Sequence, residues 1–111
     1  MSPDKPAEIP AAVRRALAAI DALDNDAFVA AFAEDGYVDD WGREFRGPDA
    51  VRGWSDAEFI GVRVSLDVTE VEERDGAVTV TAQVGGDGFN GPSHFTFDVA
   101  GDRVSRMTIR A

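Results

Sequence analysis

Hydrophobic residues recur at helical spacing near the start of the chain. Between residues 9 and 22 they fall every three or four positions, at Ile9, Val13, Leu17 and Ile20. This spacing places them on one face of a helix, so 9–22 is predicted to be an amphipathic helix. The preceding residues, 1–8, carry polar and helix-breaking residues, and we expect them to form a flexible N-terminus.

Two more helices and two short strands are predicted before residue 60. Asp24-Asn25-Asp26 offers an N-cap for a helix that ends before Gly36 and carries Phe28 and Phe32 four residues apart. Strands over 37–41 and 44–46 follow. Gly47-Pro48-Asp49 indicates the start of the next helix, because proline suits the first helical turn. Its apolar side consists of Val51, Trp54 and Phe59.

The hydrophobic period changes to two after residue 61, as in strands. Alternating apolar positions run to Val68 and change phase at Val71, which predicts a long strand from Val62 with a bulge near Glu70. Asp75-Gly76 is a hairpin signal. The strands that follow have apolar residues on one face, a loop over 85–92 and a turn at Gly101-Asp102 between 93–99 and 103–110. Helices followed by a meander of strands indicate an α+β domain with its helices on one face of the sheet.

Length and composition agree with a single globular domain, which we place at 9–111. The chain has 111 residues, of which 44% are hydrophobic and 29% charged. Its formal net charge is −10, from 21 acidic and 11 basic side chains, and nearly all the basic residues are arginines scattered singly. Nucleic-acid binding requires clustered positive charge, so no nucleic-acid partner is expected.

Membrane, metal and cofactor roles also lack support in the sequence. No apolar run approaches the roughly 20 residues that span a bilayer. The first residues do not show the basic-then-apolar order of a signal peptide, so we expect no membrane partner and a cytoplasmic location. The chain has no cysteine, which excludes thiolate chemistry, and no spacing of histidine and carboxylates suggests a metal site. No cofactor is expected.

The run Asp35-Gly36-Tyr37-Val38-Asp39-Asp40-Trp41 combines carboxylates with aromatic surface. A carboxylate in such surroundings can become an acid or base with a raised pKa. Side chains alternate along a strand, so Asp40 and Asp39 are predicted to face opposite ways, with Tyr37 on the face of Asp39. One carboxylate at most then enters a pocket.

The segment from Ala11 to Trp54 resembles the nuclear transport factor 2-like superfamily, which includes ketosteroid isomerases and SnoaL-like polyketide cyclases. It has the helical pair, the acidic strand, the short hairpin and a helix with the pattern Gly-x-x-Ala-Val-x-x-aromatic. The later runs Ser93-His94-Phe95-Thr96-Phe97 and Val104-Ser105-Arg106-Met107 fit the same family. The resemblance implies a cone, in which a curved antiparallel sheet and three N-terminal helices enclose a pocket. Family members include enzymes and non-catalytic binding proteins, so the fold does not choose between them.

The same resemblance places Asp40 where ketosteroid isomerases keep their carboxylate base, which makes it a candidate base here. The two donors that stabilise the oxyanion in those enzymes are absent, because their positions correspond to Ala16 and Ser93. Losing one such donor can cost about two orders of magnitude in rate, so a steroid isomerase of the usual type is not expected. The indole N–H groups of Trp41 and Trp54, with the Ser93 hydroxyl, are candidate replacements.

Two functions remain open for the predicted pocket, which suits an uncharged, largely apolar small molecule with a carbonyl or hydroxyl. The protein binds such a molecule without catalysis, or it is an isomerase, cyclase or lyase in which Asp40 removes a proton. The missing donors favour binding. Phe89 in the glycine-rich loop is a candidate lid, and the full set of predicted lining residues is Val38, Trp41, Trp54, Phe59, Phe89, Ser93, Phe95 and Met107. The resemblance also implies a homodimer through the convex face of the sheet, supplied largely by 62–84. Strand alternation predicts that His94 lies on the convex face or at a subunit contact.

Overall fold

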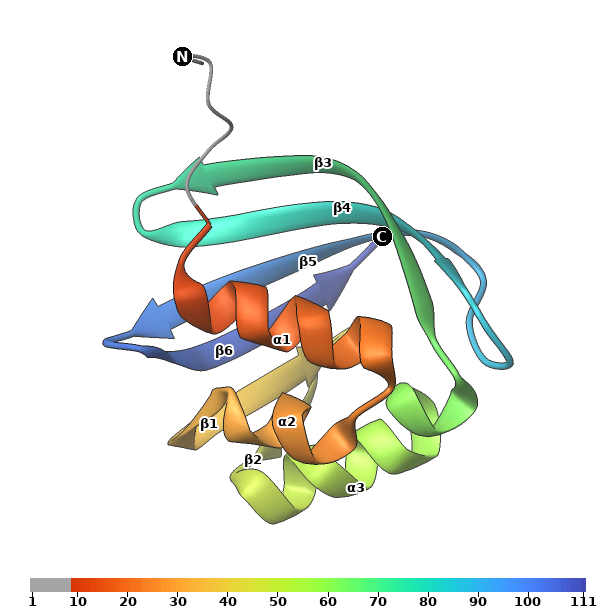
Figure 1. Cartoon of the computed structure of the whole chain (residues 1–111), viewed down its shortest axis with the longest axis horizontal. Helices are drawn as coiled ribbons and strands as arrows, with labels where there is room; N and C mark the ends of the chain where they lie inside the picture. The colour runs from red at the N-terminus through yellow and green to blue at the C-terminus, as the bar shows by residue number, and fades with distance from the viewer. Residues whose placement is uncertain (1–8) are drawn as a thin grey trace.

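A computed structural model describes residues 9–111, and the predicted flexible segment 1–8 lies outside this range. Residues 9–111 form three α-helices, one short 3-10 helix and six strands (Figure 1). The elements follow one another as α1 (Ala11–Ala22), α2 (Asn25–Ala30), β1 (Phe32–Asp40), β2 (Arg43–Arg46), α3 (Pro48–Glu58), η1 (Ile60–Val62), β3 (Ser65–Arg74), β4 (Ala77–Gly85), β5 (Gly91–Ala100) and β6 (Arg103–Arg110).

The six strands form one curled sheet in the order β2-β1-β6-β5-β4-β3, with the three helices on its inner side (Figure 1). The predicted α+β class with three helices is confirmed. The first strand, predicted over 37–41, is longer than expected, so one long strand, β1, lies ahead of α3. The sheet is mixed, because β1 and β6 run parallel while every other neighbouring pair is antiparallel. Hairpin signals predict pairing between consecutive strands only, whereas β1 joins a strand about seventy positions later in the chain.

The second helix is shorter than predicted, and Phe32 belongs to a strand. Asp24 caps α2 through a hydrogen bond from the Ala27 N–H to its carboxylate (3.1 Å), as the sequence indicates. The helix ends at Ala30, because Val104 N–H donates to the Ala31 carbonyl (2.8 Å) and draws the backbone into the sheet. Phe28 and Phe32 still meet, with ring centroids 5.2 Å apart. Their spacing was interpreted as one helical face, but the contact bridges the junction of helix and strand.

The predicted bulge and hairpin in the second half are confirmed. The register between β3 and β4 shifts between Val68 and Glu70. Asp75 and Gly76 both have positive φ, 54° and 83°, as a tight two-residue hairpin turn requires. The start of β3 was predicted too early, since the strand begins at Ser65 and Val62 lies in η1, where it turns toward the site described below.

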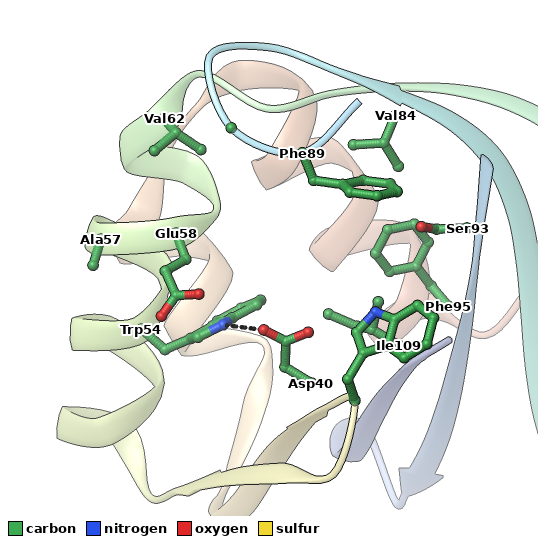
Figure 2. Close-up of a pocket in the computed structure, with 12 residues that line it drawn as sticks. Asp40, Trp54, Ala57, Glu58, Val62, Val84, Phe89, Ser93, Phe95 and Ile109 are labelled. Atoms are coloured by element: carbon green, nitrogen blue, oxygen red, sulfur yellow. Dashed lines mark hydrogen bonds between the residues drawn. The ribbon is translucent and has the colours of Figure 1, made fainter. Parts of the chain in front are cut away.

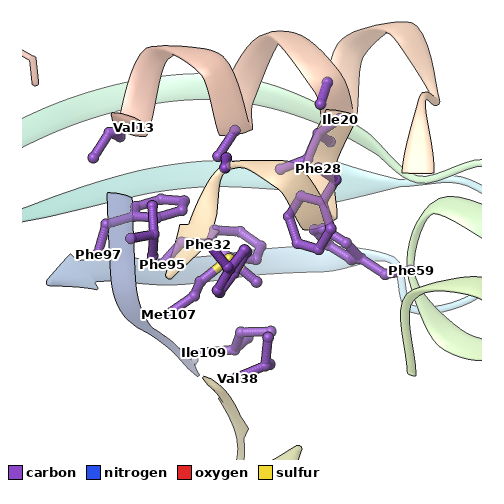
Figure 3. Packing of buried hydrophobic residues seen from close by; sticks show 14 of the residues in the cluster. Val13, Ile20, Phe28, Phe32, Val38, Phe59, Phe95, Phe97, Met107 and Ile109 are labelled. Atoms are coloured by element: carbon purple, nitrogen blue, oxygen red, sulfur yellow. The ribbon is translucent and has the colours of Figure 1, made fainter. Parts of the chain in front are cut away.

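The core lies between the concave face of the sheet and the helices. Val13 and Ile20 of α1 pack over inward residues of β5 and β6, including Phe95, Phe97 and Met107 (Figure 3). These side chains are at least 98% removed from solvent. The packed core fills one part of the cone, and the ends of β1, α3, η1 and β5 converge elsewhere, around an open space.

Candidate ligand-binding site

A pocket of about 340 Å³ opens where these ends converge (Figure 2). Its volume falls near the lower limit of typical small-molecule sites, roughly 300–1,000 Å³. The lining combines aromatic and aliphatic side chains with two carboxylates and one hydroxyl, from Asp40, Trp41, Trp54, Ala57, Glu58, Val62, Val84, Gly88, Phe89, Ser93, Phe95 and Ile109.

Local geometry brings the polar residues to this pocket. Asp40 is the last residue of β1 and pairs directly with Arg43 of β2, across a two-residue turn in which Trp41 and Gly42 both have positive φ. That turn leaves Trp41 56% exposed at the pocket rim. On α3, Trp54 and Glu58 are four residues apart and therefore share one face of the helix.

Asp40 is held by two donors to a single oxygen. Its Oδ2 accepts hydrogen bonds from Trp54 Nε1 (3.0 Å) and from the guanidinium of Arg43 (Figure 2 shows the first). Within residues 9–111, no hydrogen-bond partner is found for Oδ1. The side chain is 15% exposed and lines the pocket. Asp40 therefore presents one fixed oxygen and one oxygen that can accept a hydrogen bond from a ligand.

Arg43 joins Asp40 to a second carboxylate. It donates to both oxygens of Glu58, at 2.7 and 3.1 Å. These hydrogen bonds hold the pKa of Glu58 below its usual range, and the same contacts raise the pKa of Arg43. Arg43 itself is not among the pocket-lining residues, and its side chain is 53% exposed. Neither Arg43 nor Glu58 is among the residues predicted for the site, although Glu58 follows Trp54 by four positions and Arg43 follows Asp40 by three.

The aromatic and hydroxyl groups proposed as oxyanion donors have different surroundings. The only N–H of the Trp54 indole is directed at Asp40, so in this structure it is not free to meet a ligand. Trp54 stacks on Phe59, with centroids 4.9 Å apart. Ser93 is 2% exposed and lines the pocket from β5, with no hydrogen-bond partner for its hydroxyl among residues 9–111. The Ser93 hydroxyl therefore remains available to a ligand.

The predicted lining residues divide into two groups. Asp40, Trp41, Trp54, Phe89, Ser93 and Phe95 all line the pocket. Val38, Phe59 and Met107 do not, because they belong to the packed core behind it. Val38 lies two residues before Asp40 on β1 and pairs in register with Met107 of β6. Phe59 is enclosed by other aromatic rings. Ligand contact remains a prediction for the first group alone.

Phe89 lies at the pocket mouth, on a loop whose backbone carbonyls accept hydrogen bonds from the side chain of Asn90. The Asn90 side-chain amide donates to the carbonyls of Gly86 (2.9 Å) and Gly88 (3.1 Å). The Phe89 ring packs against Gly91, which has a φ of 147° and where a Cβ would come within 3.1 Å of the ring. Phe89 nevertheless remains 56% exposed at the rim of the pocket.

Asp39 faces away from the pocket, as predicted, but it is paired rather than free in solvent. Its carboxylate accepts hydrogen bonds from Arg110, at 3.2 Å to each oxygen, and from the Gly42 N–H at 2.7 Å. The bond from Arg110 is the main cause that lowers the pKa of Asp39. Tyr37 lies on the same outer face beneath Arg46, whose guanidinium is 4.0 Å from the ring centroid. Neither residue contributes to the site.

Within residues 9–111 there is no cluster of three or more His, Cys, Asp and Glu that could hold a metal ion. In the same range, no helix combines the length and apolar character needed to cross a bilayer.

Comparison with known proteins relates this architecture to solved structures. A protein from Sinorhizobium meliloti, named as a candidate polyketide cyclase, is 25% identical, with a TM-score of 0.82 over 92% of this chain and 95% of the other. A Catenulispora acidiphila protein of ketosteroid isomerase-like fold, crystallised with trimethylamine, is 23% identical, with a TM-score of 0.76 over 94% of this chain and 87% of its own. A Mycobacterium tuberculosis protein in complex with estradiol-17beta-hemisuccinate is 17% identical, with a TM-score of 0.76 over 94% and 95% of the two chains.

The last two structures show a likeness of fold alone at these identities. No curated protein matches the sequence. A family model described as SnoaL-like domain matches residues 13–107. Since that match spans most of its length, the chain belongs to the SnoaL-like domain family, within the nuclear transport factor 2-like superfamily.

Proposed function

We propose that the protein binds a small, largely apolar molecule in the pocket beside Asp40. The observation that carries the proposal is a cavity of about 340 Å³ with mostly apolar walls and a few polar groups at fixed positions. Ligand sites commonly have this composition, because apolar walls supply affinity and a few polar groups set orientation. In this site, Asp40 and Ser93 supply the orienting groups.

The relatives support a pocket role without fixing the ligand. The Sinorhizobium meliloti protein is named for cyclase chemistry, and the Mycobacterium tuberculosis protein was crystallised with a steroid derivative. Both are described in terms of small organic molecules. A ligand for this chain would have to fit a pocket at the small end of the usual range.

Intrinsic fluorescence offers a direct test, because both tryptophans of the chain, Trp41 and Trp54, line the pocket. Prodan, a neutral environment-sensitive naphthalene, is expected to quench tryptophan emission and to shift its own emission to shorter wavelength on binding. Ala57→Leu adds side-chain volume at the lining and should weaken prodan binding about tenfold or more.

The matched control is Ala18→Leu. It makes the same replacement on α1, in the groove between α1 and α2, away from the pocket. The control should bind prodan as the unmodified protein does. Equal affinity in both variants, or no prodan binding to any of them, would contradict the proposed function.

The alternative function is an isomerase, cyclase or lyase in which Asp40 is the general base. The free Oδ1 facing the pocket favours it, since a proton could be accepted there. The orientation of the Trp54 N–H toward Asp40 argues against it, because that donor was the candidate closest to the carboxylate for stabilising an oxyanion.

Asp40→Asn separates binding from catalysis, since asparagine keeps the shape and an oxygen that can accept from Trp54. For a binding protein that makes no use of proton transfer, turnover of any discovered carbonyl ligand should be absent in both proteins. Turnover in the unmodified protein that falls by about two orders of magnitude or more in Asp40→Asn, with ligand affinity retained, would establish the alternative.

The homodimer and the cytoplasmic location also stay proposals. Within 62–84, the inward valines of β4 face the core, and the outward positions include Thr79 and Thr81, beside Glu70 and Glu72 of β3. Thr79 also shares a hydrogen bond with Thr96 (3.0 Å). A dimer through this outer face would therefore rest mainly on polar and charged contacts.

A further inference from the structure

We infer that the preferred ligand of the pocket is an organic cation, a small molecule with a positively charged, alkylated nitrogen. The inference rests on the proposed function and narrows its ligand class. The sequence suggested an uncharged ligand because only one carboxylate was expected at the site, whereas the structure places Glu58 there as well.

The charges that line the cavity are all negative. Asp40 and Glu58 are both among the lining residues, and no Lys, Arg or His from residues 9–111 lines the cavity. Glu58 is ionised at neutral pH, because Arg43 lowers its pKa. Arg43 touches both carboxylates but lies outside the lining, so the three side chains together carry a net charge of −1. The residues that line the pocket therefore carry negative charge, and the positive charge of Arg43 lies behind them.

The aromatic lining suits a cation with apolar substituents. Four rings face the cavity, from Trp41, Trp54, Phe89 and Phe95. The faces of such rings carry negative electrostatic potential, which attracts an ammonium group, and indole attracts it most strongly. Alkyl groups on the nitrogen would at the same time bury apolar surface against these rings.

Two polar groups are already positioned to anchor such a ligand. Trp54 and Arg43 fix Oδ2 of Asp40, which leaves Oδ1 as an acceptor at the cavity without a partner among residues 9–111. Ser93 is 98% buried and its hydroxyl, likewise unpaired within that range, lies across the pocket from Glu58 (Figure 2). This hydroxyl lines the cavity, so it can hydrogen-bond to a hydroxyl or carbonyl on the ligand.

The net charge of the whole protein also favours a positively charged ligand. With a formal net charge of −10, it attracts cations from a distance and repels anions, which raises the rate at which a cationic ligand arrives.

Choline and neohexanol form a matched pair of probes for this inference. They have the same shape and the same hydroxyl, and differ only in whether the quaternary centre is nitrogen or carbon. Binding is followed by NMR shifts of the Trp41 and Trp54 indole N–H signals. Choline should bind about tenfold tighter than neohexanol, or better, with a preference that weakens at high salt.

Three variants test whether the preference for choline over neohexanol depends on the carboxylates of the pocket. Glu58→Gln should reduce it severalfold, while Arg43→Gln should increase it, because it removes the opposing positive charge. Glu44→Gln is the control: it makes the same change in net charge at an exposed residue that pairs in register with the outward-facing Asp39, and it should leave the preference unaltered.

Equal or tighter binding of neohexanol would overturn the inference and leave the proposed function standing. Indole signals that move with neither probe would also overturn it, and prodan binding would then decide the proposed function separately. A choline preference that falls equally in Glu58→Gln and Glu44→Gln would show that the general charge of the protein, not the pocket, is responsible, which likewise contradicts the inference.

Discussion

Phe59→Ala is expected to lower the free energy of unfolding by about 3–5 kcal/mol, the range for deleting a buried aromatic ring. Phe59 is 5% exposed and packs against three rings, with centroids at 4.9 Å to Trp54, 5.6 Å to Phe28 and 6.1 Å to Phe95. Domains of this size are stable by only about 5–15 kcal/mol, so the variant should lose a large part of its stability. The melting temperature should fall by more than about 10 °C.

The matched control is Phe89→Ala, which deletes the same ring from a residue that is 56% exposed. Its cost should stay within about 1 kcal/mol, because little buried contact is lost. Urea titration followed by circular dichroism measures both variants. Similar losses at the two positions would mean that Phe59 does not hold the aromatic cluster together.

The cluster around Phe59 also explains why this residue matters to the site without lining it. Trp54 lies between Phe59, on which it stacks, and Asp40, to which it donates a hydrogen bond. Removing the Phe59 ring would leave Trp54 free to tilt, and the orientation of Asp40 depends on Trp54. Residual folded Phe59→Ala protein should therefore bind prodan more weakly than the unmodified protein does.

The sequence was sufficient where a structural feature depends on neighbouring residues. The α1 periodicity, the Asp24 cap, the bulge before Glu70 and the Asp75-Gly76 turn are local features, and each is confirmed. The prediction of a helix at Phe32 is wrong, because a separation of four residues from Phe28 fits both a shared helical face and a contact across a helix-to-strand junction. The parallel pairing of β1 with β6 has no local signal at all.

The same distinction applies to the site. Asp40 and Trp54 were found through a family pattern, but the hydrogen bond between them depends on how α3 docks against β1. Arg43 and Glu58 lie fifteen residues apart in sequence and meet only after the hairpin and the helix have packed together. A carboxylate that appeared isolated in the sequence is one of two in the structure, and this pairing changes the expected ligand from neutral to cationic.

The close approach of backbone at Gly61 leads to the second large expected effect. A Cβ added at this residue would lie 1.6 Å from the carbonyl oxygen of Asp56 and 2.5 Å from its carbon. These are backbone atoms near the end of α3, so the clash can be relieved only by moving η1 away from the helix. We expect Gly61→Ala to cost about 3 kcal/mol in the free energy of unfolding, at the upper end of typical overpacking.

Gly53→Ala is the control because it adds the same methyl group eight residues earlier, where nothing lies within 4 Å. Gly53 is inside α3, so alanine should stabilise the protein there by about 0.5–1 kcal/mol. Opposite signs in the two denaturation curves are the expected result. A neutral Gly61→Ala would mean that the junction of α3 and η1 is looser than the structure indicates.

The Gly61 effect should extend to the pocket, because η1 is part of its wall. Val62 lines the cavity, and its carbonyl accepts a hydrogen bond from the Asp87 N–H (2.9 Å) at the base of the loop that carries Phe89. Displacing η1 therefore moves a wall residue and loosens the loop at the mouth. Gly61→Ala should weaken prodan binding under conditions where the variant is still folded, whereas Gly53→Ala should bind normally. Undiminished binding by folded Gly61→Ala would separate the α3–η1 junction from the function of the pocket.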